Sequence, residues 1–444
     1  MNNINIHNVL KKYWGFESFR SKQEAIINDV LVQKDTLALL PTGGGKSICY
    51  QIPAIVKEGI CIVISPLVAL MKDQTIKLKK RNIQAIAITG GLNQHELDVA
   101  LDNCIYGNIK LLYLSPERLE SDIVRERIKK MNVNLIAVDE AHCISQWGYD
   151  FRPSYLKIAE IRALKPDTPI LALTATATKK VVKDIQDKLL FNKQNVIQNS
   201  FKRANLAYMV LEESHKSTRV HKILQKIKGS AIIYVRSRKK TYEFSSELNK
   251  LGVRSTYYHA GLSEDERAEN QEKWMSNTMR VMVATNAFGM GIDKPDVRLV
   301  IHLQNPDTTE AYFQEAGRAG RDGGNAFAIN LFQKSDLEDS INQFTENYPS
   351  SSDVRNIYQN MANFLQIAIG DGYEQSYDFE FEKFCSKYQL NKYKCIKALN
   401  ILEKDNLIKY NSYNNSPSSA HVICNSKSII NYKSPCLLYT SDAA

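Results

Sequence analysis

The sequence predicts an α/β fold in which two tandem parallel-sheet domains precede a mostly helical region. Short apolar runs alternate with longer helix-like segments in two separate series along the 444 residues. Continuous apolar strands spaced by helices are typical of parallel sheets that are covered on both faces. After Ser340 these runs stop and the sequence becomes helical and rich in tyrosine and asparagine. This change predicts a third region of a different kind.

The first domain is expected over residues 1–205 and the second over residues 206–338, with a join near residues 200–210. The apolar runs that predict the first sheet are residues 37–40, 60–65, 85–89, 111–115, 134–140 and 170–176. The runs that predict the second sheet are residues 231–235, 255–259, 281–285, 299–303 and 326–332. Neither series has a short repeat, so a solenoid is not expected.

The third region is expected over residues 339–410 and is predicted to open with a linker at residues 349–352, Pro-Ser-Ser-Ser. Residues 381–410 have the pattern of two amphipathic helices and a short strand, an order that suits a winged helix; a plain helical capping domain is the alternative. Residues 411–444 are predicted to be a low-complexity loop and a tail. Because the tail resembles translated adapter sequence, the natural chain is expected to continue.

Composition excludes disordered and membrane-embedded proteins, since 43% of residues are hydrophobic and 24% charged. No apolar stretch approaches the roughly 18 residues of a transmembrane helix, and the N-terminus lacks the apolar core of a secretory signal, so a cytoplasmic protein is expected. The eight cysteines are scattered without a CxxC pair, which argues against a zinc cluster or a disulfide framework. The net charge of +10 indicates either a polyanionic partner or only a basic surface.

A glycine-rich segment follows the first predicted strand directly. Its residues are Pro41, Thr42, Gly43, Gly44, Gly45, Lys46 and Ser47. Glycines let backbone N–H groups close around phosphate oxygens, while Lys46 would reach the β- and γ-phosphates and Ser47 would offer its hydroxyl to Mg²⁺. The strict motif has glycine where this chain has Leu40, and a tight glycine-rich turn is the alternative.

Two carboxylates follow a later apolar strand. Asp139 and Glu140 open a DEAH sequence that ends at His142. In this arrangement an Asp holds Mg²⁺ and a neighbouring Glu polarises the attacking water, although acidic residues at a strand end also cap helices. His142 is expected to couple the nucleotide site to Gln314 or its neighbours; a structural hydrogen bond is the alternative.

Two arginines lie three residues apart in the second domain. Arg318 and Arg321 follow Gln314 on a predicted helix turn. Arginines that face phosphates held by another domain stabilise the charge that develops in phosphoryl transfer. A solvated face is the alternative.

These motifs resemble those of the RecQ family of DNA helicases, superfamily 2 motors with two RecA-like domains, over residues 8–335. The segment from Trp14 to Gln23 resembles the family's adenine-recognition motif. The resemblance implies that Phe16 packs on the base, that Arg20 lies beside it and that Gln23 hydrogen-bonds its edge.

The segment from Cys143 to Pro153 resembles the family's aromatic-rich loop, which links single-stranded DNA binding to hydrolysis. Trp147 and Phe151 would offer stacking surfaces worth about 1–3 kcal/mol per base, and Arg152 adds a cation next to them. Gln146 precedes the aromatic residues. Buried core packing is the alternative for the aromatics.

Further segments match family blocks in order, and they imply DNA contacts and coupling to domain motion. They are residues 65–74, 115–118, 174–177, 236–238, 258–262 and 284–295. Ser237, His259 and Thr285 are the residues expected to contact DNA phosphates in the second domain. The chain departs from the family in having no cysteine in residues 336–384, so zinc is not expected, and no HRDC domain is recognised.

The prediction is therefore an ATP- and Mg²⁺-dependent 3′→5′ DNA helicase of recombination and repair in the bacterial cytoplasm, associated with the nucleoid. Expected partners are single-stranded and forked or partially duplex DNA and a single-strand-binding protein, and no membrane. The alternatives are an RNA helicase or a duplex translocase, and a non-enzymatic nucleic-acid-binding protein with a relic nucleotide fold.

Residues 340–444 hold ten basic and ten acidic residues, so the whole net charge lies in residues 1–339. A salt-sensitive DNA track over the two α/β domains is expected.

Overall fold

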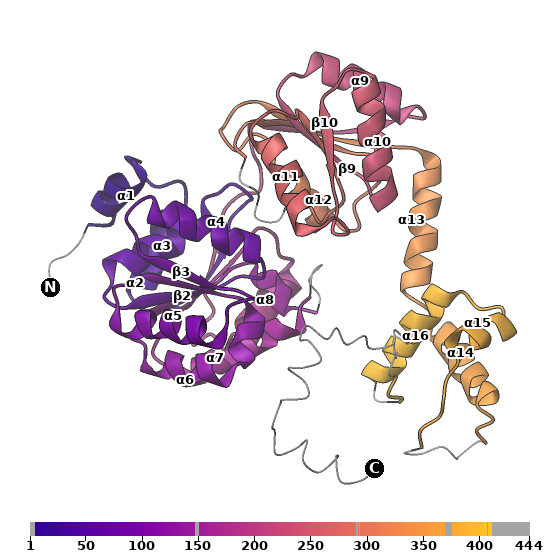
Figure 1. The fold of residues 1–444 in the computed structure, drawn as a ribbon, viewed down its shortest axis with the longest axis horizontal. Helices are drawn as coiled ribbons and strands as arrows, with labels where there is room; N and C mark the ends of the chain where they lie inside the picture. The colour runs from indigo at the N-terminus through magenta and orange to yellow at the C-terminus, as the bar shows by residue number, and fades with distance from the viewer. Residues whose placement is uncertain are drawn as a thin grey trace, which may run out of the picture. The chain divides into compact units, whose positions relative to one another are not determined.

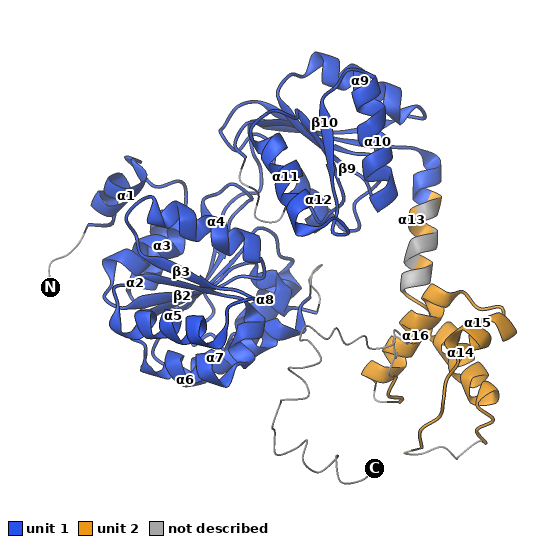
Figure 2. Cartoon of the chain, in the orientation of Figure 1, with its two compact units in different colours: residues 1–337 blue, residues 338–444 orange. Residues whose placement is uncertain are grey.

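The computed structural model describes residues 5–146, 151–289, 292, 294–368, 375–405 and 407–410. The chain divides into two compact units, residues 1–337 and 338–444 (Figure 2). Within the described residues the first unit carries two parallel sheets, each in its own domain, and the second unit is helical (Figure 1). The predicted α/β class with two RecA-like sheet domains is confirmed.

The first sheet has seven strands in the order β3-β4-β2-β5-β6-β1-β7. The strands are β1 (Thr36–Leu39), β2 (Ile60–Ile64), β3 (Ala85–Ile88), β4 (Leu111–Leu114), β5 (Val133–Val138), β6 (Ile170–Thr174) and β7 (Val196–Gln198). All their pairings are parallel. Each of the six apolar runs predicted for this domain forms a strand, and β7 is additional.

Helices cover both faces of this sheet because successive strand residues point to opposite sides. Leu37 and Leu39 of β1 join the core under one set of helices, whereas Ala38 and Leu40 join the core under the other set. The first set is α5 (Gln94–Tyr106), α6 (Asp122–Lys130), α7 (Ile158–Leu164) and α8 (Lys179–Lys188). The second set is α2 (Gln23–Leu31), α3 (Lys46–Val56) and α4 (Val68–Lys79), and α1 (Ile6–Trp14) packs on α2 and α3.

The second sheet has six strands in the order β10-β11-β9-β12-β13-β8. They are β8 (Leu206–Glu212), β9 (Ser230–Tyr234), β10 (Ser255–Tyr258), β11 (Val281–Ala284), β12 (Val297–His302) and β13 (Ala326–Phe332). Helices α9 (Lys216–Lys226) and α10 (Arg238–Lys250) cover one face, and α11 (Glu264–Met275) and α12 (Thr309–Ala316) cover the other. The five predicted runs are strands, and β8 is additional.

The second unit has a small apolar core between its helices. Helix α13 (Lys334–Asn347) leads from the second sheet, and α14 (Ser351–Phe364), α15 (Phe381–Lys387) and α16 (Lys392–Lys404) follow. Ile357, Phe384 and Leu399 are buried together in this core. None of the helices in the described part of the chain has both the length and the apolar character needed to cross a membrane.

Two expectations for this region were wrong. Residues 349–352 are not all linker: Pro349 and Ser350 connect α13 to α14, but Ser351 and Ser352 are the start of α14, because Ser350 and Asp353 form a capping box with each other's backbone N–H groups. Residues 407–410 contain no strand. The predicted tail at 411–444 lies outside the described residues, and the winged helix stays a prediction.

Candidate functional site

The carboxyl ends of the first sheet's strands bring the predicted nucleotide-binding residues together. The phosphate loop, residues 41–47, follows β1, and Asp139 and Glu140 follow β5. Strand β6 lies between β1 and β5 in the sheet. Because the carboxyl ends of parallel strands share one edge, residues far apart in sequence meet there.

The phosphate loop has a backbone that favours glycine. Gly43 and Gly45 have φ values of 79° and 73°, in the left-handed region that residues with a side chain rarely adopt. A Cβ on Gly44 would lie 2.8 Å from the Pro41 carbonyl oxygen. Helix α3 begins at Lys46, and no side chain caps its N-terminus. These residues fit a phosphate group, since the first N–H groups of a helix attract anions.

The predicted adenine-recognition segment contacts this loop. Gln23 is buried; its Nε2 donates to the carbonyl oxygens of Gly44, at 3.2 Å, and Gly45, at 3.0 Å. The Arg20 guanidinium donates to the Gly43 oxygen at 2.7 Å. Phe16 is 48% exposed. Arg20 and Gln23 therefore hold the loop, and their contacts with adenine remain predicted.

The two carboxylates differ in their electrostatic surroundings. Lys46 Nζ lies 3.6 Å from Glu140 Oε1. Burial would raise the pKa of Glu140, but the nearby cations, above all Lys46, outweigh it and lower that pKa. Burial and the charge of Glu140 raise the pKa of Asp139 to about 6. The cations beside the loop therefore favour the ionised form of Glu140, whereas burial and the charge of Glu140 disfavour that of Asp139.

Glu140 also has an unusual backbone, with φ 47° and ψ 46°. A non-glycine residue in this region stores strain, which is frequent at active sites. Its Oε2 atom is buried and accepts no hydrogen bond from the described residues. Ser47 and Asp139 supply hydroxyl and carboxylate oxygens, the ligand types that Mg²⁺ prefers. The donor set therefore fits Mg²⁺.

His142 links these carboxylates to the end of β6. Its Nδ1 lies 2.9 Å from Thr174 Oγ1 and 3.5 Å from Glu140 Oε2. Thr174 opens the segment that was expected to couple hydrolysis to domain motion. Gln314 is buried on α12, and coupling between His142 and Gln314 remains a prediction.

The arginine loop, residues 317–325, follows α12 and contacts the phosphate loop. Helix α12 ends at Ala316; Arg318 lies in a helix-like turn that follows it, as predicted, because its N–H donates to the Glu315 oxygen, whereas Arg321 lies beyond that turn. A Cβ on Gly43 would lie 3.1 Å from Arg321 Cγ, and a Cβ on Gly317 would lie 3.1 Å from Thr42 Cβ. The two loops therefore pack against each other.

Both arginines donate to the backbone of the β11–β12 connection. The Arg318 guanidinium donates to the Gly289 oxygen, and Arg321 Nη1 donates to the Ile292 oxygen at 2.6 Å. The charge of Arg318 also contributes to the lowered pKa of Glu140.

The predicted DNA-binding residues of the second domain lie beyond the carboxyl ends of three neighbouring strands. Ser237 follows β9, His259 follows β10 and Thr285 follows β11, so the parallel sheet brings them to the same side. His259 Nδ1 accepts a hydrogen bond from the Gly261 N–H at 3.1 Å, and Thr285 is buried.

The aromatic-rich loop is described only in part, because Trp147 lies outside the described residues. Gln146 is exposed, and Lys188 Nζ lies 6.0 Å from the centre of the Phe151 ring. Arg152 Nη1 donates to the Pro66 oxygen at 3.4 Å, and Pro66 belongs to residues 65–74, one of the segments expected to contact DNA.

Sequence reasoning missed two residues between the domains. A small pocket beside the phosphate loop is lined by Thr42, Thr176, Arg203, Tyr208 and Phe313. Arg203 and Asn205 contact the arginine loop. The only available signal was an arginine and an asparagine just before the apolar stretch of β8.

Known proteins resemble the chain over both sheet domains. The family model for DEAD/DEAH box helicases matches residues 20–185, and the model for the helicase conserved C-terminal domain matches residues 215–323. Dbp5 of S. cerevisiae, solved bound to RNA and ADP BeF3, has a TM-score of 0.58 at 18% identity and covers 76% of this chain and 90% of its own. The helicase MrfA bound to DNA has a TM-score of 0.63 at 17% identity, covering 77% of this chain and 50% of its own. These two likenesses show the shared fold.

Sequence relatives are more specific. The Bacillus subtilis protein named "Probable ATP-dependent DNA helicase RecS" is 42% identical over 75% of this chain, which spans 68% of that relative. The ATP-dependent DNA helicase RecQ of the same organism is 44% identical over 74% of this chain, which spans 56% of it. The RecQ of Pasteurella multocida is 40% identical over 74% of this chain, which spans 52% of it. The chain belongs to the RecQ family of ATP-dependent DNA helicases in superfamily 2.

Proposed function

We propose that this chain hydrolyses ATP with Mg²⁺ at the phosphate loop and uses the reaction to move 3′→5′ along single-stranded DNA. The observation that carries the proposal is the contact between the phosphate loop and the arginine loop, with Lys46 and Glu140 beside it. Phosphoryl transfer depends on positioning and charge stabilisation, and this contact supports a site with Lys46 on one side and the two arginines on the other.

The residues divide the chemistry between them. The loop N–H groups and Lys46 bind the phosphates, and Glu140, kept ionised by its neighbours, accepts the proton of the attacking water. Ser47 and Asp139 would hold Mg²⁺, which neutralises phosphate charge when bound. Arg318 and Arg321 stabilise the negative charge that develops on the transferred group.

The proposed DNA track runs along the aromatic-rich loop of the first domain and the carboxyl ends of strands β9, β10 and β11 in the second domain. Gln146, Trp147, Phe151 and Arg152 of the first domain and Ser237, His259 and Thr285 of the second grip bases and phosphates of the single strand. Forked or partially duplex DNA is the substrate, and recombination and repair in the nucleoid are the setting. A single-strand-binding protein is the proposed protein partner, and no zinc is required.

The test replaces single residues of the nucleotide site. Lys46→Ala and Glu140→Gln are each expected to reduce ATP turnover stimulated by single-stranded DNA about a hundredfold or more, since Lys46 acts on the reacting phosphate and Glu140 acts on the attacking water. Glu140→Gln keeps the loop intact and should still bind ATP. Phosphate release and unwinding of a labelled fork are measured with DNA and with RNA.

The matched control is Lys34→Ala, which removes an exposed lysine paired with Asp29 and should leave turnover unchanged. Normal turnover in either site variant would contradict the assignment of the site. Faster unwinding of the RNA fork would favour an RNA helicase.

A further inference from the structure

We propose that Arg203 and Asn205, in the segment that joins the two sheet domains, are positioning residues for the arginine loop. The inference rests on the proposed function, because it takes Arg318 and Arg321 as the groups that face the nucleotide. Neither Arg203 nor Asn205 belongs to the motifs that suggested the site.

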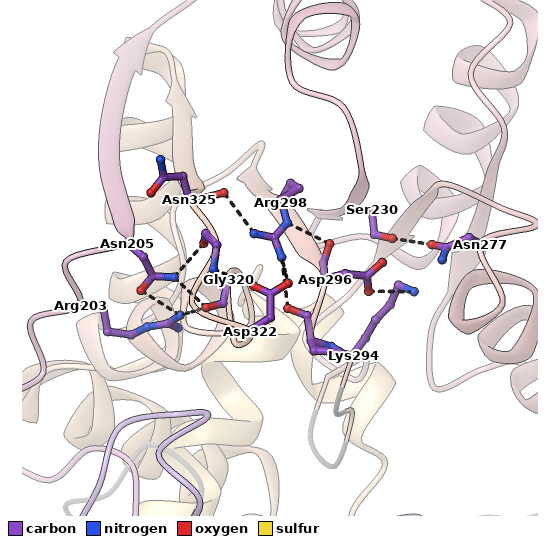
Figure 3. Close-up of polar contacts among 12 residues, drawn as sticks. Arg203, Asn205, Ser230, Asn277, Lys294, Asp296, Arg298, Gly320, Asp322 and Asn325 are labelled. Atoms are coloured by element: carbon purple, nitrogen blue, oxygen red, sulfur yellow. Dashed lines mark hydrogen bonds and ion pairs between the residues drawn. The ribbon is translucent and has the colours of Figure 1, made fainter. Parts of the chain in front are cut away.

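Both side chains bind backbone oxygens of the arginine loop (Figure 3). Arg203 Nη1 donates to the Gly317 oxygen at 3.0 Å, and Arg203 Nη2 donates to the Gly320 oxygen. Asn205 Nδ2 donates to the oxygens of Gly320 and Gly324, each at 2.8 Å. The two side chains thus fix the loop on either side of Arg318 and Arg321, and hydrogen bonds from a guanidinium are the stronger kind.

The backbone at Gly320 approaches Asn205 closely. Gly320 has φ 61°, and a Cβ there would lie 2.6 Å from Asn205 Nδ2. The main chain of Asn205 is fixed, because its backbone carbonyl oxygen accepts from the Ala326 N–H at 2.9 Å and the next residue pairs with Ala326 across β8 and β13. The side-chain amide therefore extends to the loop from a backbone that the sheet holds in place.

Asp322 and Asn325, in the C-terminal part of the arginine loop, are held by a residue of the second domain itself. Arg298 on β12 forms an ion pair with Asp322 and donates to the Asn325 oxygen at 3.3 Å (Figure 3). Arg203, by contrast, belongs to the joining segment and lines the same pocket as Thr42 of the phosphate loop. The joining segment therefore sets where the two arginines lie relative to the phosphate loop.

The test is Asn205→Asp, which keeps the size of the side chain but turns a carboxylate oxygen toward two carbonyl oxygens. We expect kcat for ATP hydrolysis at saturating single-stranded DNA to fall about tenfold or more, because small displacements of a catalytic group are costly. KM for ATP and the affinity for ADP should change less than about twofold, because the phosphate loop is untouched.

The control is Asn249→Asp, which alters an asparagine that binds the Ser255 backbone at 2.8 and 3.0 Å in the same domain. The midpoint temperature of thermal unfolding should be the same for Asn249→Asp and Asn205→Asp, but kcat of Asn249→Asp should equal that of the wild type. If Asn205→Asp does not fold, Arg203→Lys is measured instead. It keeps the positive charge but cannot donate to the Gly317 and Gly320 oxygens from two separate nitrogens.

A double-mutant cycle with Arg321→Ala separates positioning from a general structural effect. If Asn205 acts through Arg321, the double variant hydrolyses ATP no more slowly than Arg321→Ala alone. Additive losses, a rise in KM that accounts for the fall in activity, or an unchanged kcat would each overturn the positioning role. If Arg321→Ala loses activity and Asn205→Asp does not, only this inference fails. If Arg321→Ala stays fully active, the proposed site is wrong and the inference fails with it.

Discussion

Gly45 is a residue whose replacement should affect nucleotide binding through a single added methyl group. A Cβ at this position would lie 2.3 Å from Gln23 Nε2, and φ is 73°. We expect Gly45→Ala to push Gln23 off the carbonyl oxygens of the loop and to weaken ATP binding about tenfold or more, the effect of about 1.4 kcal/mol. Equilibrium titration with a fluorescent ATP analogue measures this.

Gly15→Ala is the matched control for Gly45→Ala. Gly15 has nearly the same backbone, with φ 74°, but nothing lies within 4 Å of the added Cβ. It should cost a similar conformational penalty, about 1–2 kcal/mol, and leave ATP affinity unchanged. Equal ATP affinities in the two variants would contradict the role given to the contact between Gln23 and the phosphate loop.

At the same scale, the sequence reveals some site residues and hides others for a physical reason. Lys46, Asp139 and Glu140 lie in short motifs directly after apolar strands, so local pattern is enough to identify them. Arg203 and Asn205 contact oxygens that lie 114–119 residues away in the sequence. Only the paired strands β8 and β13 bring these partners together, and no local pattern reports that pairing.

Among the secondary-structure elements, the strands that could be predicted are those buried on both faces. Strands such as β2 and β4 are buried at every position, which yields an uninterrupted apolar run. Strands β7 and β8 lie at sheet edges and are mostly exposed. Strand β7 has only three residues, too few for a pattern, and β8 is an apolar run whose side chains are mostly exposed, so neither shows the uninterrupted burial of the central strands.

The start of α14 was missed because serine and proline favour loops and helix N-termini alike. The serines at 350–352 alone are typical of a linker. Together with Asp353, however, Ser350 forms a capping box, which is typical of a helix N-terminus. The same carboxylate pairs with Lys394 of α16 at 2.7 Å. One side chain therefore fixes both the start of a helix and its packing on another.

This pair predicts a pH dependence within the second unit. Hydrogen bonds from Lys394 and Ser350 lower the pKa of Asp353 from 3.8 to about 2. A depressed pKa contributes stability that is fully present above the unfolded value of 3.8 and is lost as the pH falls toward 2. Amide hydrogen exchange of α14 in the full chain should therefore show protection that declines over this range.

Asp353→Asn provides the comparison for that measurement. The variant should be less protected than the wild type at pH 6, and the difference should shrink as the pH falls through about 2, because Asp353 then becomes protonated and loses its charge. A constant difference between the two proteins across this range would show that the charge of Asp353 does not stabilise α14.

For the whole molecule, the charge distribution predicts how DNA binding responds to salt. The entire net charge of +10 lies in residues 1–339, the part that carries both sheets. Affinity for single-stranded DNA should fall linearly with salt on logarithmic axes, since phosphate contacts release counterions. Arg152→Ala should weaken binding at low salt and reduce the slope by about one, as measured by fluorescence anisotropy from 50 to 300 mM KCl, roughly the range in which this effect is large.

Lys397→Ala tests the alternative that the helical unit carries the main DNA contacts. Lys397 is exposed on α16, and its replacement should leave the slope unchanged. A reduction as large as that from Arg152→Ala would contradict a track confined to the two sheet domains.

The pairing of β8 with β13 determines when the second domain can be completed during synthesis. The first strand of this sheet leaves the ribosome early, but its partner at Ala326–Phe332 emerges more than a hundred residues later. Until then β8 has an unpaired edge, a condition that slows folding and exposes the chain to aggregation. The helicase C-terminal family model, at residues 215–323, includes neither strand. A fragment cut at those bounds would lose one edge of its sheet together with Arg203 and Asn205, and would leave the backbone N–H and C=O groups along one edge of β12 unpaired.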